Sequence, residues 1–150
     1  MSNFLAVLHT YSETQFSEPG VFKSPNIDLQ RKAIDSRLIS LRGKLCGEIF
    51  SEFTTEPGYS LTTLITKSYN LDISGIIFFT IDSLRKLDSQ IDLHFLNILW
   101  QKYPSISFLV ESIYFSNTIE FSLVAEKIVA INSCIKRDRS NDWLDFVKKI

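Results

Sequence analysis

Four short apolar runs constrain the fold of this chain more than any other feature. They cover residues 3–9, 45–50, 75–81 and 106–110, and each one ends in polar side chains. The stretches between them carry apolar residues at helical spacing, and short apolar runs that alternate with helices are typical of buried parallel strands. The sequence therefore predicts an α/β domain with four strands in one parallel sheet.

Helix signals lie between the first three runs. Ser24 followed by Pro25 is typical of an N-cap with proline at the first helical position, and Gly43 supplies the stop. After the second run, Pro57 breaks the chain and Ser60 is placed to cap a short second helix. Both helices fall where a parallel sheet needs its crossovers.

Two further helices complete the pattern. The third is expected to begin near Asp88 or Ser89 and to end at Pro104. Asn117 and Glu120 have the spacing of a capping box at the start of a fourth helix. With right-handed crossovers this order gives a three-layer, flavodoxin-like domain with a four-stranded parallel sheet and a C-terminal extra helix.

Size and charge limit the domain count and the classes of partner. At 150 residues and 17.3 kDa the chain fits one domain, with a core over 1–132 and a connector and helix over 133–150. Its 16 Lys plus Arg and 17 Asp plus Glu lack the basic excess of a dedicated nucleic-acid binder. No apolar stretch approaches the roughly 20 residues that span a membrane, and the N-terminus has no signal-peptide pattern. We therefore expect a cytoplasmic protein that binds neither nucleic acid nor membrane.

Metal and cofactor motifs are missing from the sequence. Cys46 and Cys134 form no CxxC pair, and two isolated histidines match no metal-ligand spacing. Neither GxGxxG nor GxxxxGK[ST] occurs, so dinucleotide and P-loop chemistry have no support. The sequence predicts no cofactor.

Each predicted strand runs into hydroxyl or carboxylate side chains. Since the carboxyl ends of parallel strands share one edge of the sheet, these residues are expected to meet in one crevice that binds a small anionic or sugar ligand. We take three residues as catalytic candidates and six as ligand-binding candidates. The catalytic candidates are Ser12, Glu56 and Glu111, and the ligand-binding candidates are Tyr11, Thr54, Thr55, Ser60, Asp82 and Ser83.

The segment EIFSEFTTEPGYS is the densest part of this set. The helix N-terminus at Ser60 offers N–H donors to a phosphate or carboxylate, and Glu56 would serve in proton transfer. The same residues are also typical of a solvated loop before a Pro-Gly turn. His9 is open to two interpretations as well, either as a group that helps to activate Ser12 or as a hydrogen-bonded interior histidine.

Four blocks in order, SPNIDLQRKAI, IFSEFTTE, DISGIIFFTIDSL and SISFLVES, cover much of residues 4–130. In this order they resemble the sporadic carbohydrate cluster proteins, small bacterial proteins found among surface-polysaccharide biosynthesis genes. The resemblance implies matching helix-start, Thr-Glu and Glu positions in that family. These map onto Pro25, Gln30, Thr55, Glu56 and Glu111.

The chain also resembles the catalytic domain of serine resolvases. Ser12 follows the first strand, Asp82 the third and Glu111 the fourth, as in that family. However, Thr10 and Ser83 stand where two arginines that stabilise the scissile phosphate belong, and no basic helix-turn-helix follows. This resemblance therefore implies a related fold without recombinase activity.

Two functional hypotheses follow. The first is an accessory or enzymatic protein of bacterial surface-carbohydrate biosynthesis that binds a small anion such as a sugar phosphate at the carboxyl edge of the sheet. The alternative is a non-catalytic, resolvase-like oligomeric interaction or regulatory module. In either case the apolar breadth of the third helix and the apolar terminal helix around Trp143 predict a homo-oligomer.

Overall fold

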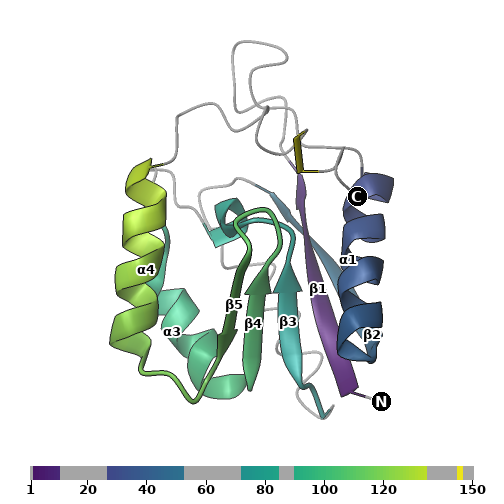
Figure 1. Cartoon of the computed structure of the whole chain (residues 1–150), viewed down its shortest axis with the longest axis horizontal. Helices are drawn as coiled ribbons and strands as arrows, with labels where there is room; N and C mark the ends of the chain where they lie inside the picture. Colours follow the sequence, from purple (N-terminus) through teal and green to yellow (C-terminus); the bar gives the residue numbers. More distant parts are fainter. Residues whose placement is uncertain (1, 11–26, 53–71, 85–89, 135–144, 147–150) are drawn as a thin grey trace.

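Five strands form one sheet in the computed structural model of the chain, which describes residues 2–10, 27–52, 72–84, 90–134 and 145–146 (Figure 1). The strand order across the sheet is β2-β1-β3-β4-β5. The strands are β1 (Ser2–Thr10), β2 (Gly43–Glu52), β3 (Gly75–Phe78), β4 (Ser105–Phe108) and β5 (Ile113–Ser116). The helices are α1 (Ile27–Leu41), the 3-10 helix η2 (Ile81–Leu84), α3 (Leu93–Lys102) and α4 (Phe121–Cys134).

The parallel core agrees with the four apolar runs. β1 pairs in parallel with β2 on one side and with β3 on the other, and β3 pairs in parallel with β4. All four residues of β3 are buried, as expected for a strand covered on both faces. The predicted parallel arrangement of these strands is confirmed.

The predicted strand number is wrong, because a fifth strand extends the sheet. β5 pairs antiparallel with β4, with Ser105 opposite Ser116 and Phe108 opposite Ile113. A short turn joins the two strands, in which Ser112 adopts a left-handed φ of 54° and its N–H donates to the carbonyl of Leu109 at 3.1 Å. The four residues of β5 alternate between buried and exposed positions, which is the pattern of a strand with one covered face.

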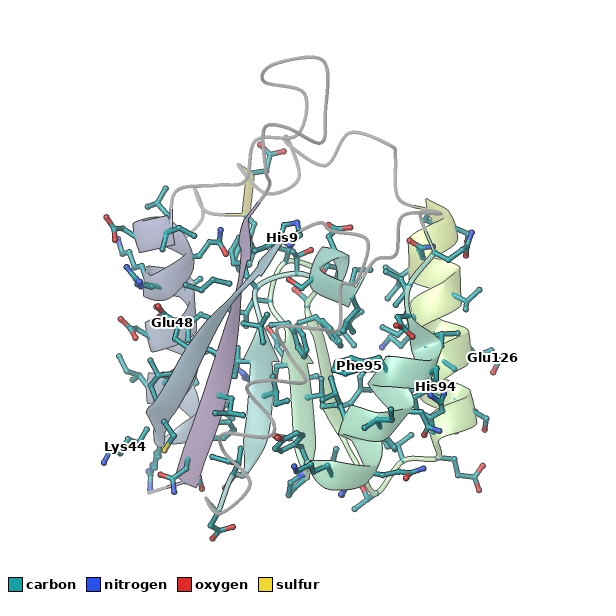
Figure 2. The ribbon with its side chains drawn as sticks, turned by 180° about the vertical axis from the view of Figure 1, so that it is seen from behind. His9, Lys44, Glu48, His94, Phe95 and Glu126 are labelled. Atoms are coloured by element: carbon teal, nitrogen blue, oxygen red, sulfur yellow. The ribbon has the colours of Figure 1, made fainter. Side chains whose placement is uncertain are left out.

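The strands bury two sets of apolar side chains on opposite faces. Alternate β1 residues separate into these sets, since successive side chains of a strand point to opposite faces. One cluster joins Phe4, Ala6, Leu8, Ile77 and Phe79 to Ala33, Ile34 and Leu38 of α1. The other joins Leu5, Val7, Phe78 and Phe108 to Phe95, Leu96, Leu99 and Trp100 of α3 and Val124 and Ile128 of α4. Figures 1 and 2 show α1 on one side of the sheet and α3 on the other.

Two helices begin later in the chain than their sequence signals predict. α3 begins at Leu93, because the carboxylate of Asp92 accepts the N–H of Phe95 at 3.0 Å and caps the helix. α4 begins at Phe121, three residues after the start that a capping box of Asn117 would give. The short helix expected after Ser60 and most of the terminal helix lie outside the described residues. No described helix has the length and apolar character needed to cross a bilayer.

The direction of the strands decides where the polar residues that follow them lie. β1, β3 and β4 all run toward the same edge, where η2 follows β3 and the turn to β5 follows β4 (Figure 1). Thr80, Asp82 and Ser83 therefore meet the end of β1 and the residues after β4. This carboxyl edge is where open α/β sheets bind ligands.

Gly75 provides a test of the packing between β3 and β4. A Cβ on Gly75 would overlap the hydroxyl of Ser105 and lie 2.7 Å from the carbonyl oxygen of Ser105 and 3.1 Å from the ring of Phe4. Since a backbone atom cannot yield as a flexible side chain does, Gly75→Ala is expected to lower the free energy of unfolding by about 2 kcal/mol. Urea unfolding measures this loss. Ser116→Ala, on the exposed edge of the same sheet, should change stability by less than about 0.5 kcal/mol. Equal stability of both variants would contradict the tight approach at Gly75.

Candidate functional site

The structure describes three of the nine predicted site residues, and it brings them to one edge of the sheet. Asp82 and Ser83 lie in η2 with 1% exposure each, and Glu111 lies half-buried after β4. The other six lie outside the described residues. They are Tyr11, Ser12, Thr54, Thr55, Glu56 and Ser60, so their meeting with this group stays a prediction.

The polar side chains at this edge form a hydrogen-bond network with Thr80 at its centre. Its members are His9, Gln30, Thr80, Asp82, Ser83 and Glu111. The side-chain oxygen of Thr80 lies 3.0 Å from Oδ2 of Asp82 and 2.9 Å from Oε2 of Glu111. The same oxygen accepts the backbone N–H of Asp82 at 3.3 Å. A hydroxyl carries one proton, so Thr80 donates to one of the two carboxylates at a time. Two carboxylates thus share a single hydroxyl that is itself fully buried.

Glu111 joins the two chain segments at this edge. Its Oε1 accepts the backbone N–H of Ile81 at 2.8 Å, while Oε2 faces Thr80. Backbone hydrogen bonds from Leu109 to Phe78 and from Val110 to Phe79 bring the end of β4 alongside the end of β3. Glu111 therefore holds the first turn of η2, where backbone N–H groups have no partner within the helix.

His9 and Ser83 form the second part of the network. His9 lies at the end of β1 and is fully buried, and its Nδ1 is 3.2 Å from Oγ of Ser83 (Figure 2). Either atom is the donor, depending on the tautomer of the ring. His9 is therefore a buried histidine with a hydrogen bond at Nδ1, and its role toward Ser12 stays a prediction because Ser12 lies outside the described residues.

Gln30 of α1 holds the backbone of His9. Its Oε1 accepts the His9 N–H at 2.8 Å, and its Nε2 donates to the His9 carbonyl at 2.8 Å. The ladder between β1 and β3 ends at Val7 and Phe78, with one more bond from Phe79 N–H to the Val7 carbonyl. The amide of Gln30 therefore pairs with β1 at the point where β3 has turned into η2.

Gln30 and Thr80 belong to this network but were not among the nine predicted site residues. Gln30 interrupts an apolar stripe formed by Ile27, Ile34 and Leu38, and this polar residue at a buried helix position was the available signal. Thr80 ends an apolar run, so it is easily taken as the last residue of a strand.

The network contains side chains of the types that catalyse reactions, but His9 and Ser83 are buried away from solvent. A serine beside an imidazole has the composition of a nucleophile and its base. However, His9 is 0% and Ser83 1% exposed, so solvent and substrate do not reach them in this arrangement. Among the described residues, no group of three or more His, Cys, Asp or Glu is placed to bind a metal ion.

Comparisons with known proteins give a structural likeness and no sequence match. No family model and no curated protein matches the chain, so the resemblance to the sporadic carbohydrate cluster proteins has no support from them. The fold is similar to that of the N-terminal catalytic domain of TP901-1 integrase, with a TM-score of 0.53 and 18% identity. The similarity covers 86% of this chain and 94% of that domain. At this identity the likeness shows the fold, and it agrees with the resolvase-like α/β fold that the sequence predicts.

Gln30→Leu tests the bond between α1 and β1. The substitution keeps the helix and the approximate size of the side chain but removes both hydrogen bonds to His9. Because two buried backbone groups lose this partner, the free energy of unfolding should fall by about 3 kcal/mol. Gln101→Leu, at an exposed position of α3, is the matched control and should change it by less than about 0.5 kcal/mol. A Gln30→Leu protein as stable as the control would show that the amide does not hold the sheet.

Thr80→Val tests the shared hydroxyl. Valine has nearly the same shape, so the variant removes the hydrogen bonds to Asp82 and Glu111 without opening a cavity. We expect a loss of about 2 kcal/mol in urea unfolding, since two carboxylates lose their donor, and Thr80→Ser should restore most of it. Thr118→Val, on the exposed turn after β5, serves as the control. If Thr80→Val unfolds at the wild-type urea concentration, the hydroxyl contributes nothing to the edge.

Proposed function

We propose that this chain is a three-layer, resolvase-like domain that does not cleave DNA and acts as an oligomeric interaction or regulatory module. The proposal has two supports. The first is the fold likeness to an integrase catalytic domain. The second is the polar network at the carboxyl edge, where Ser83 stands in place of an arginine and is buried.

The observation that carries the proposal is the state of Ser83. This residue stands where the resolvase resemblance places an arginine that stabilises the scissile phosphate. Ser83 is 1% exposed and its hydroxyl contacts the ring of His9 at 3.2 Å. A neutral, buried hydroxyl that is held by an imidazole cannot supply the positive charge that a phosphoryl-transfer transition state needs.

The remaining groups of the edge support the same interpretation. Asp82 and Glu111 share the hydroxyl of Thr80, and Glu111 also holds the backbone of Ile81. These contacts stabilise η2 and the end of β4, so the carboxylates act in the folding of the edge. No described contact favours the surface-carbohydrate role over this one.

The outer surface of α3 and α4 supports the oligomeric part of the proposal. Ile98 on α3 is 45% exposed, and Leu123 and Val129 on α4 are 56% and 54% exposed. Large apolar side chains at these exposures on two neighbouring helices favour a protein contact. We expect a closed homo-oligomer, since symmetric closure is the usual way to cover such a surface.

The proposal predicts two results from the purified chain. Incubation with duplex DNA should give no SDS-resistant protein–DNA adduct above the level of Ser12→Ala, because a serine that attacks a phosphodiester stays covalently attached to it. Light scattering at micromolar concentration should give at least about twice the chain mass of 17.3 kDa.

Each part of the proposal can fail separately. An adduct that forms with the wild-type chain and disappears in Ser12→Ala would show strand cleavage and overturn the non-catalytic assignment. A mass of 17.3 kDa at all concentrations would overturn the oligomeric assignment.

A further inference from the structure

Phe146, near the end of the chain, packs on the end of β3. The rings of Phe146 and Phe79 meet edge to face, with centroids 5.6 Å apart and an interplanar angle of 73°. Phe79 is fully buried, and Phe146 is partly buried against the apolar cluster on the α1 face of the sheet. Figure 1 shows residues 145–146, in yellow, at the level of the carboxyl end of β1. The terminal segment therefore reaches the same end of the sheet as the polar network.

Phe79 lies where the chain leaves β3, directly before the centre of the network. Its N–H donates to the carbonyl of Val7 at 3.0 Å, and its carbonyl accepts the N–H of Val110 at 2.9 Å. The next residues of the two segments are Thr80 and Glu111, whose side chains are joined by a hydrogen bond of 2.9 Å. A displacement of Phe79 therefore displaces the centre of the network.

The two faces of the sheet differ in their cover. Among the described helices, α3 and α4 pack on one face, and α1 packs on the other. Phe79 and Leu109 belong to the cluster on the α1 face and lie at the carboxyl end of the sheet. Asp145 is exposed, so of the two described residues in the terminal segment it is Phe146 that packs on this cluster. The segment thus covers this end of the α1 face through a single ring.

A contact of this size can break while the sheet stays folded. An edge-to-face ring pair and the partial burial of one side chain contribute a small part of the stability of a domain. Parts of a protein that are held by few apolar contacts open far more often than its core does. The ladders that join β1, β3 and β4 do not involve Phe146, so they persist when its ring leaves. Phe146 can therefore detach from an intact sheet.

We propose that Phe146 is the latch of a conformational switch at the carboxyl edge of the sheet. With Phe146 on Phe79, the network is closed and the side chains of His9 and Ser83 are buried. With Phe146 detached, the ring of Phe79 faces solvent, the end of β3 loosens, and His9 and Ser83 become accessible. The switch goes beyond the function proposed above, because it operates in the same way whatever the domain binds.

The two histidines of the chain allow the switch to be measured by chemical modification. Diethyl pyrocarbonate acylates an imidazole that solvent can reach, and mass spectrometry of the two peptides gives a rate for each ring. His9 is 0% exposed, whereas His94 on α3 is exposed and reports the reactivity of an open ring in the same sample (Figure 2). We expect Phe146→Ala to raise the His9 rate at least about tenfold, because it favours the detached state, and to leave the His94 rate unchanged.

Val124→Ala separates opening of the latch from unfolding of the whole chain. Val124 of α4 is 0% exposed and belongs to the cluster on the other face, so its truncation destabilises the latched and the unlatched sheet alike. The balance between these two states is then unchanged, and His9 should react within about threefold of the wild-type rate. Urea unfolding checks that each variant is folded. If Phe146→Ala is not, Phe146→Leu, which keeps an apolar side chain without the ring, carries the test with a rise of at least about threefold.

Two results would overturn the latch. One is a wild-type His9 rate in the folded variant at Phe146. The other is an equal rise of the His9 rate in that variant and in Val124→Ala, which would show that His9 reacts only when the whole chain unfolds.

Discussion

The end of β1 loses its neighbour on one side, and the side chain of Gln30 replaces that neighbour. β3 turns into η2 just past Phe78, while β1 continues to Thr10 alongside β2. The amide of Gln30 then bonds both the N–H and the carbonyl of His9. The same contact ties the start of α1 to the sheet and keeps the His9 ring beside Ser83. The placement of the rest of the carboxyl edge depends on this contact, because η2 packs against β1 at His9.

The parallel strands and α1 could be predicted because their signals are local and strong. Apolar runs with β-branched and aromatic residues mark β1 and β3, and helical spacing of Ile27, Ile34 and Leu38 marks α1. β5 was not predicted, because it is only four residues long and its buried and exposed residues alternate, so it contains no apolar run. The predicted start of α3 was wrong because Asp92 caps the helix, with its carboxylate accepting the N–H of Phe95.

Only part of the candidate site could be predicted from the sequence. Asp82, Ser83 and Glu111 share one edge as predicted, since strand direction alone brings strand ends together. Their role was not predictable, because a carboxylate that binds a ligand and one that holds a backbone N–H look alike in sequence. The structure supplies contacts that the sequence does not show: Thr80 bonds Asp82 and Glu111, and His9 bonds Ser83. The resolvase-like fold is thus combined with an edge built from internal hydrogen bonds, while Phe146 packs on the neighbouring end of β3 on the α1 face of the sheet.

The central claim is that the carboxyl edge is a closed hydrogen-bond network in solution. Native-state hydrogen exchange of the His9 and Ile81 amides tests it most directly, because side chains and not strands accept both amides. The account predicts that both exchange nearly as slowly as the amides of β1 and β3, with protection of at least about a thousandfold. Exchange at the rate of an exposed loop would show that the network opens, and the assignment of these residues to a structural role would be contradicted.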